Sequence, residues 1–515
     1  MALLGSILKR TIEIGGKFPK IRKADAYRRQ TKTLRHLIAK AEFTAFGEYY
    51  NFTKIRSSKD IIPHFQQAVD THDYNSIFKK WWYRSLNGEP YVCWPDHIKY
   101  FALSSGTSEA SSKHIPITRD MLRAIKKTSV MQILSQYHYN LPKEHFERGM
   151  LMIGGSTHLN YNGTYFEGDL SGITTGNIPF WFQHFYKPGS RISKERNWNS
   201  KLDEIVKNAR SWDIATVCGV PAWIQILFER IIKEYNVNNI HDIWPNLAIY
   251  VHGGVHFDPY KKGFEKLLAH PIIYLETYLA SEGFIAYQNR PDATGMKLVM
   301  NNGIFYEFVP FTDANFDADG TLVSRPEALH VGEVQEGVEY AILLSTCAGA
   351  WRYLIGDTIK FTSIEHYEIA ITGRTKHFLS LCGEHLSQDN MNKAIKIVAD
   401  ELNIDITEFS VAGINYESLF AHRWYIGTDE KVDAVKIKER IDEQLKILND
   451  DYRVERIAAL KDIFVEILPT HAFYDWMALH GKEGGQNKFP RVLKKEKLKD
   501  WEAYLIQNNL VKRTE

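Results

Sequence analysis

Residues 100–113 read YFALSSGTSEASSK, an apolar segment followed by small and hydroxylated residues and closed by Lys113. Residues 100–103 predict a β-strand, and Thr118 predicts the N-cap of a following helix. Small residues let backbone N–H groups approach a ligand, hydroxyl groups add donors, and a lysine neutralises negative charge. This context favours a phosphate-binding loop over a flexible linker, the other common role of such segments. The loop is not a Walker A motif, because Ser112 stands where that motif has its second glycine.

The composition is that of a globular protein. The chain has 515 residues, of which 44% are hydrophobic and 24% charged, which excludes a disordered or fibrous chain and predicts two or more domains. The formal net charge of +2 argues against a nucleic-acid binder. No apolar stretch approaches the ~18 residues of a membrane span. The 4 cysteines lie far apart, which predicts neither a disulfide framework nor a zinc site. We therefore expect a soluble, cytoplasmic protein.

The N-terminal segment is basic. Residues 1–40 hold eleven lysines and arginines against Glu13 and Asp25. Such a start is found in transit peptides and membrane-surface helices, but also in solvated helical faces. Since no small-residue cleavage site follows, the last interpretation is favoured.

The first half of the chain alternates between helical and β patterns. Helical patterns cover residues 20–80, 119–137, 198–210 and 221–235. Short β patterns lie at residues 150–154, 215–218, 247–253 and 272–275. This alternation predicts an α/β fold with a largely parallel sheet flanked by helices.

The pattern changes twice further along. Short strands with tight turns in residues 296–372 predict an antiparallel, β-barrel-like part. Helices and strands of a small α+β domain follow. We therefore expect a large domain over residues 1–373, a hinge over 374–386 and a smaller, mobile domain over 387–515.

Two acidic residues are candidates for binding a nucleotide or its metal ion. Tyr278 follows a predicted strand and can stack on a purine, while Glu282 beside it can hold Mg²⁺. Asp357 follows Gly356 and can accept hydrogen bonds from both hydroxyls of a ribose. Taken singly, each has a plainer explanation, since the first pair can serve packing and the second a Gly-Asp turn.

Two basic segments complete the set. Residues 372–376 read TGRTK and fall at the predicted domain boundary. Residues 484–491 read GGQNKFPR and present Lys488 on a glycine-rich loop, unless this is only a solvated basic loop.

The order of these segments resembles the adenylate-forming superfamily of acyl-CoA synthetases, adenylation domains and luciferases. More closely, the chain is similar to the acyl-acid amido synthetases of the plant auxin-responsive Gretchen Hagen family and their bacterial relatives. Ala110 departs from the family's loop, which usually has glycine there. The motifs that carry this resemblance are SSGTS at 104–108, WRYLIGD at 351–357, GRTKHFLSLCGEHLS at 373–387 and QNKFPR at 486–491.

The resemblance implies two half-reactions. A carboxylic acid attacks the α-phosphate of MgATP, which gives an acyl-adenylate and pyrophosphate, and an amine, commonly an amino acid, then displaces AMP to form an amide. Because the first step brings two anions together, donors and cations must offset their repulsion. No protein nucleophile is required.

The resemblance also implies the site residues. The ATP phosphates would be bound by Ser104, Ser105, Gly106, Thr107, Ser108 and Lys113. Tyr278 and Ser281 would bind the nucleotide, with Glu282 as the metal ligand. Asp357 and Arg374 would hold the ribose, and Lys488 would stabilise charge on the departing pyrophosphate.

The acid-binding pocket has weaker signals. Ligands in open α/β sheets lie at the carboxyl ends of strands, which makes Val220, Trp223, His252, Gly253 and Gly254 candidates. The alternative is that Trp223 belongs to the core. Two other functions remain open: an acyl-CoA ligase that delivers the same adenylate to a thiol, and a catalytically silent nucleotide-binding protein.

Overall fold

The structure is a computed structural model that describes most of the chain. The described residues are 22–105, 112–254, 257–317, 320–375, 378–379, 381–384, 386–480 and 489–511. They belong to two compact units, one comprising residues up to Leu103 and His114–Lys376, the other Ser104–Lys113 and His377 onward. Within these ranges, no helix has the length and apolarity needed to cross a membrane.

An 11-stranded sheet organises the first unit, in the order β12-β13-β14-β15-β11-β10-β9-β8-β7-β3-β6. The strands β6, β3, β7, β8 and β9 pair in parallel, and every pair from β9 to β12 is antiparallel. The bounds are β3 (Gly149–Met152), β6 (Tyr186–Lys187), β7 (Ile214–Cys218), β8 (Ile249–Gly253), β9 (Ile273–Ala280), β10 (Gly283–Tyr287), β11 (Met296–Leu298), β12 (Ile304–Pro310), β13 (Glu339–Thr346), β14 (Tyr353–Ser363) and β15 (Glu368–Arg374).

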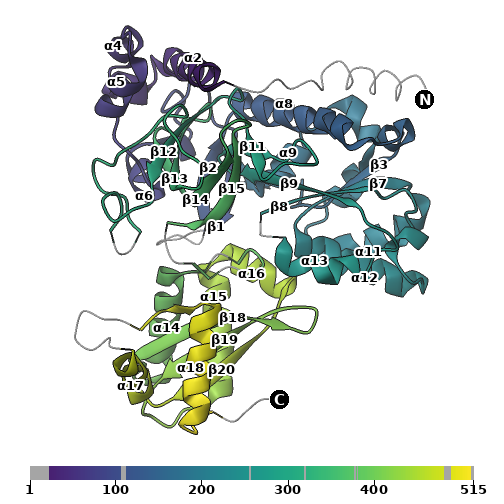
Figure 1. The fold of residues 1–515 in the computed structure, drawn as a ribbon, viewed down its shortest axis with the longest axis vertical. Coiled ribbons are helices and arrows are strands. Elements are labelled where there is room, and N and C mark those ends of the chain that lie inside the picture. The colour runs from purple at the N-terminus through teal and green to yellow at the C-terminus, as the bar shows by residue number, and fades with distance from the viewer. Residues whose placement is uncertain are drawn as a thin grey trace. The chain divides into compact units, whose positions relative to one another are not determined.

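Helices cover both faces of the parallel half. Figure 1 shows α8 on one side of strands β3, β7, β8 and β9, and α11, α12 and α13 on the other. Thr118 caps α8 by accepting a hydrogen bond from the backbone N–H of Met121 at 3.0 Å, and Pro221 occupies the first turn of α12. The helices are α8 (Arg119–Ser135), α9 (Leu170–Thr175), α10 (Ser190–Ser193), α11 (Trp198–Asn208), α12 (Pro221–Tyr235) and α13 (Asp258–Glu265). This arrangement confirms the predicted α/β class.

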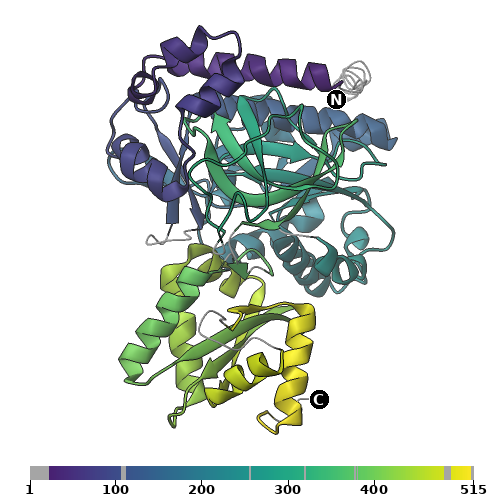
Figure 2. The ribbon, with the colours of Figure 1, turned by 60° about the vertical axis from the view of Figure 1, so that its left-hand side comes forward.

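The antiparallel half is strongly curved, as its arched strands show in Figure 2. Three strands lie between β9 and β14, so in a flat sheet with ~4.8 Å per strand they would be about 19 Å apart. Nevertheless the Tyr278 hydroxyl in β9 donates a hydrogen bond to the Asp357 carboxylate in β14. The curvature therefore brings residues from distant strands to one place.

A second sheet has the order β2-β1-β5-β4. Its strands β1 and β5 are parallel, with Tyr100 opposite Phe166 and Ala102 opposite Gly168. The bounds are β1 (Tyr100–Ser105), β2 (Ser112–Ile117), β4 (Asn160–Tyr161) and β5 (Phe166–Gly168).

Short helices before β1 pack on the antiparallel half. Their apolar residues join the same core as strands β12 to β15, with Phe46 stacked on Trp351 at 5.7 Å between ring centroids. These elements are α2 (Lys23–Ala41), α3 (Ala45–Tyr49), α4 (Phe52–Arg56), α5 (Ile61–Ala68), α6 (Tyr74–Ile77), the π-helical turn η1 (Phe78–Trp82) and α7 (Tyr83–Leu86). The helical patterns predicted over residues 20–80 thus correspond to the 19-residue helix α2 and the shorter helices that follow it.

Arg352 fastens these helices to the sheet. It lies fully inside the unit, and its guanidinium pairs with the buried carboxylate of Glu307 at 3.0 Å. The same guanidinium donates to the backbone carbonyls of Gln66 and Val69, both at 2.8 Å. Its φ of 42° is in the left-handed region, which a non-glycine residue adopts only when its surroundings require it. Arg352, part of the WRYLIGD motif, is therefore structural.

The second unit contains a four-stranded sheet in the order β20-β19-β18-β21. Strands β18 and β19 are antiparallel, while β20 and β21 pair with them in parallel. One sheet face packs on α17 and α18 around the fully buried Trp501. The bounds are α14 (Gln388–Leu402), β18 (Glu408–Tyr416), β19 (Leu419–Gly427), α15 (Ala434–Leu448), α16 (Asp450–Ile457), β20 (Leu460–Leu468), α17 (His471–Leu479), β21 (Val492–Leu493) and α18 (Lys495–Gln507).

Three details differ from the sequence prediction. Tyr278 lies inside β9 rather than after it, because that strand continues to Ala280. Asp357 lies within β14 and not in a turn, since Gly356 with φ 93° leaves the strand unbroken. Arg374 ends β15 instead of standing in a turn. For Asp357 and Arg374, pairing with a neighbouring strand overrides the local turn signal of the preceding glycine.

The Arg352–Glu307 ion pair leads to a prediction about the free energy of unfolding. Glu307→Gln removes one charge of a buried pair and should lower the free energy of unfolding by about 3–5 kcal/mol, because Arg352 keeps an uncompensated charge. Urea unfolding followed by tryptophan fluorescence measures the change. Glu89→Gln is the matched control, since the Glu89 carboxylate pairs with Arg84 at the surface and should matter by less than ~1 kcal/mol. Equal effects of the two substitutions would contradict the structural role.

Candidate functional site

Tyr278, Asp357 and Arg374 form the centre of the candidate site. The Tyr278 hydroxyl donates to one oxygen of the Asp357 carboxylate, and Arg374 Nε donates to the other at 2.7 Å. Asp357 and Arg374 are directly opposite each other in the β14–β15 pair. Side chains from β9 and β15 thus both donate to one carboxylate of β14.

The electrostatics favour this arrangement. Burial, together with the adjacent carboxylate of Asp357, raises the pKa of Tyr278 well above its ordinary value, so the phenol stays protonated and donates. Burial alone would lower the pKa of Arg374, but Asp357 raises it, and the guanidinium remains charged. The side chains of Arg374 and Asp357 are 27% and 13% exposed, so a ligand can reach them.

Glu282 belongs to the same neighbourhood. It lies in the turn between β9 and β10 next to Ser281 and is buried. The Tyr353 hydroxyl of β14 is hydrogen-bonded to it, and burial together with Glu282 raises the pKa of Tyr353 well above its usual range. Among the described residues, no three His, Cys, Asp or Glu side chains are grouped as metal ligands. A metal at Glu282 would therefore depend on oxygens of a bound substrate.

The N-terminal helices contribute to the site, which the sequence did not reveal. The Tyr74 hydroxyl of α6 accepts a hydrogen bond at 2.9 Å from the backbone N–H of His114, in β2 next to Lys113. His72 forms a β-bridge with Tyr353: its backbone N–H donates to the Arg352 carbonyl at 2.9 Å, and its carbonyl accepts from the Leu354 N–H at 2.8 Å. Neither Tyr74 nor His72 was among the candidates predicted from the sequence.

The predicted phosphate loop joins two neighbouring strands. Ser104 and Ser105 end β1, and Ser112 and Lys113 begin β2. Gly106, Thr107 and Ser108 lie outside the described residues.

The acid-pocket candidates lie at the carboxyl ends of β7 and β8. Val220 occupies the N-cap position of α12. Its Cγ2 atom lies 3.7 Å from the position that a Cβ atom on Gly254 would take. A Cβ on Gly253 would lie 2.4 Å from the backbone oxygen of Thr277, so only glycine lets β8 approach β9 here. His252 is buried and stacks on Phe257 with 4.5 Å between ring centroids. The structure thus brings Val220 and His252–Gly254 to one edge of the sheet.

Trp223 makes a different contact. Its ring lies against Trp198, with 4.2 Å between ring centroids, at the N-terminal turns of α12 and α11. Both indole nitrogens are buried and make no hydrogen bond within the described parts of the chain.

The motif at 373–387 is anchored by Glu384 in the second unit. The Glu384 carboxylate accepts hydrogen bonds from the backbone N–H groups of Leu381 and Cys382 at 2.9 Å and from His422 Nε2 at 2.8 Å. Burial raises the pKa of this carboxyl, but His422 and the backbone donors outweigh it and lower the pKa to about 2. Glu384 is therefore charged at neutral pH and ties its segment to β19.

The end of the lysine loop is fixed in the same unit. Phe489 is buried against Phe473 and Trp501, each at 4.9 Å between ring centroids. The Ser410 hydroxyl donates to the backbone oxygen of Pro490 at 2.6 Å, and Arg491 pairs with Glu408. Lys488 itself lies outside the described residues.

The sequence matches three domains of one protein family in order. They are the GH3 family N-terminal domain over residues 20–188, the central domain over 297–374 and the C-terminal domain over 389–497. Among curated proteins it is similar to jasmonoyl–L-amino acid synthetase JAR4 of Nicotiana attenuata, with 22% identity over 429 residues, which is 70% of each chain. It is also 27% identical over 183 residues, about 30% of each chain, to the probable indole-3-acetic acid-amido synthetase GH3.12 of Oryza sativa subsp. japonica.

Two solved structures have the same fold. The GH3.15 acyl acid amido synthetase aligns with a TM-score of 0.56 and 16% identity over 92% of this chain and 93% of that chain. A 2-hydroxyisobutyryl-CoA ligase in complex with 2-HIB-AMP and CoA aligns with a TM-score of 0.58 and 12% identity over 95% and 94%. The fold is thus shared by enzymes whose names specify different acyl acceptors.

Proposed function

The chain belongs to the GH3 family, and we propose that it is an ATP-dependent acyl-acid amido synthetase. It would adenylate a carboxylic acid with release of pyrophosphate and then transfer the acyl group to an amine, in particular an amino acid. The family supports this proposal, since its members JAR4 and the indole-3-acetic acid-amido synthetases are named for amide formation.

The position of Asp357 is the observation that carries the proposal. An ionised carboxylate has about four lone-pair directions, and Tyr278 and Arg374 use one on each oxygen. The remaining two can accept the 2′- and 3′-hydroxyls of a ribose, and the flanking donors hold the carboxylate in place for them. The Tyr278 ring would then lie beside the base, and Arg374 beside the sugar.

The other roles follow from the resemblance and from placement. Ser104, Ser105, Gly106, Thr107 and Ser108 would donate to the ATP phosphates, with Lys113 as the cation. Ser281, in the turn after β9, would bind the nucleotide, and Glu282 beside it would hold Mg²⁺, which neutralises phosphate charge when bound. Since Glu282 is the one carboxylate assigned to this role, most ligands of the ion would be substrate oxygens.

The chemistry can be written as two displacements. A carboxylate oxygen of the acid forms a bond to the α-phosphorus while the bond to the pyrophosphate oxygen breaks. The amine nitrogen then bonds to the acyl carbon, the bond to AMP breaks, and the nitrogen loses a proton. The enzyme positions the reactants and stabilises charge, and needs no covalent intermediate on the protein. Val220 and His252–Gly254 would line the acid site, with Trp223 as a further candidate.

We place the reaction in the cytoplasm. All four cysteines are free, which fits a reducing compartment.

Pyrophosphate release with a panel of carboxylic acids tests the proposal. We expect release that depends on the acid and on Mg²⁺ without any acceptor, and faster turnover when amino acids are added. Acceleration by CoA alone would instead identify an acyl-CoA ligase. Absence of acid-dependent release across the panel would indicate a protein without adenylation activity.

Asp357→Asn tests the ribose contact. The substitution should weaken ATP binding by about tenfold or more, because a hydrogen bond to a charged group contributes ~1.5–3 kcal/mol. Binding of 2′,3′-dideoxy-ATP should change much less, since that nucleotide has no hydroxyl for the carboxylate. Tyr278→Phe, which keeps the carboxylate, should retain the preference for ATP. Equal losses for both nucleotides in Asp357→Asn would show that the residue only shapes the sheet.

Lys488→Ala tests the role of the C-terminal unit. We propose that this unit rotates about the segment 374–386 and carries Lys488 to the pyrophosphate during adenylation, a step supported by the anchoring of the residues after it. Adenylation should slow by about 10²–10³, while aminolysis of a supplied acyl-adenylate should stay within a few-fold of the parent. Lys497→Ala, an exposed lysine of α18, is the matched control. Loss of both half-reactions together would refute a step-specific role.

A further inference from the structure

A pocket of about 460 Å³ lies in the first unit, between the start of β1, the segment before β4 and helix α9. Its size is within the range of small-molecule sites in proteins. None of the residues predicted to bind the nucleotide or the acid lines it. Tyr100 is the first residue of β1 and Ser104 is four residues further along the strand. At ~3.3 Å per residue, their Cα atoms are about 13 Å apart. The pocket is therefore distinct from the predicted phosphate loop.

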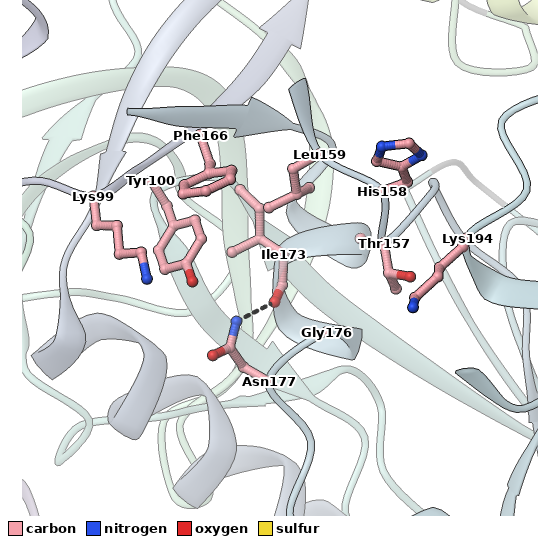
Figure 3. A pocket seen from close by; sticks show the side chains of 11 residues that line it. Lys99, Tyr100, Thr157, His158, Leu159, Phe166, Ile173, Gly176, Asn177 and Lys194 are labelled. Atoms are coloured by element: carbon pink, nitrogen blue, oxygen red, sulfur yellow. Dashed lines mark hydrogen bonds between the residues drawn. The ribbon is translucent and has the colours of Figure 1, made fainter. Parts of the chain in front are cut away.

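One wall of the pocket is aromatic. Tyr100 and Phe166 are directly opposite each other in the β1–β5 pair, with 5.9 Å between ring centroids and an angle of 38° between the ring planes. Figure 3 shows these two rings beside Leu159 and Ile173. Such a wall suits an aromatic body, since aromatic rings pack well in offset and edge-to-face contacts.

A close contact between α9 and a loop shapes the other side. A Cβ on Gly172 would lie 2.2 Å from the backbone oxygen of Ser156, so only glycine permits the loop to approach the helix here. This approach places Thr157 beside α9. Asn177, in the same wall, donates its side-chain N–H to the Ile173 carbonyl at 2.8 Å.

Two lysines stand at opposite ends of the pocket (Figure 3). At one end Lys99 Nζ lies 5.4 Å from the Tyr100 ring centroid and 5.6 Å from that of Phe166. At the other end Lys194 lies beside Thr157. Among the described residues neither ammonium group has an ion-pair partner, and no carboxylate lines the pocket. Glu167, the nearest acid along β5, instead contacts His114 and Asn160, at 3.1 and 2.8 Å.

We propose that this pocket binds a small organic dianion with an aromatic body and an acidic group at each end. The body would pack on Tyr100, Phe166 and Leu159, and the acidic groups would pair with Lys99 and Lys194. The site is separate from the adenylation chemistry, so its occupancy does not depend on the function proposed above.

Fluorescence titration of the full chain with three naphthalene probes tests the proposal. The probes are naphthalene-2,6-dicarboxylate, 2-naphthoate and the neutral 2-naphthalenemethanol. At low ionic strength each carboxylate should tighten binding about threefold to fivefold, since both lysines are partly solvated. The affinity should therefore be highest for naphthalene-2,6-dicarboxylate, lower for 2-naphthoate and lowest for 2-naphthalenemethanol.

Substitutions locate the binding. Lys99→Ala and Lys194→Ala should each lower the affinity for the dicarboxylate to that of 2-naphthoate and leave the neutral probe unaffected. Lys207→Ala, which removes another exposed lysine of this unit, should change nothing. Leu159→Trp should fill the pocket, because this lining residue is only partly buried, and should weaken all three probes more than tenfold, with thermal unfolding as the control for folding. Equal affinities for the three probes, or lysine variants indistinguishable from the parent, would overturn the proposal.

Discussion

The Asp357 carboxylate is the constraint on which the candidate site depends. A partly buried charge must be paired and hydrogen-bonded to be tolerated, and its two donors come from β9 and β15. Since three strands lie between β9 and β14, the Tyr278–Asp357 contact exists only because the antiparallel half of the sheet curves. The same curvature carries the turn with Glu282 toward Tyr353. The cluster of Tyr278, Asp357 and Arg374 therefore depends on the curvature of this sheet.

The N-terminal helices are part of this arrangement rather than an appendage. Arg352 pairs with Glu307 and also satisfies backbone carbonyls at the end of α5, which fixes the helices to strands β12 and β14. A buried ion pair contributes little net stability but is costly to break, so its main effect here is to specify how the segments fit together. Through Tyr74 and His72 the same helices reach the strand after the phosphate loop and the strand that bears Asp357.

The second unit also has a buried carboxylate, that of Glu384, which joins separate segments. The Glu384 carboxylate accepts hydrogen bonds from two backbone N–H groups and from His422, so residues 381–384 of the predicted hinge are held to the sheet of that unit. Phe489 and Arg491 fix the other end of the lysine loop to the same sheet and its helices. Both segments therefore belong to the same compact unit.

The sequence by itself determined the α/β class, the helix that begins at Thr118, and the order of motifs that indicates a GH3-like enzyme. These features rest on local patterns: apolar periodicity, capping residues and short segments of unusual composition. Only the tertiary structure decided that Asp357 and Arg374 lie within strands, that Arg352 is structural, and that Tyr74 and Tyr353 support the site. The reason is physical. A glycine beside an aspartate signals a turn locally, but hydrogen bonds from neighbouring strands outweigh that preference. Contacts such as Tyr278 with Asp357 or Arg352 with Gln66 join residues far apart in sequence, and their partners are set by sheet curvature and packing, which no local pattern specifies.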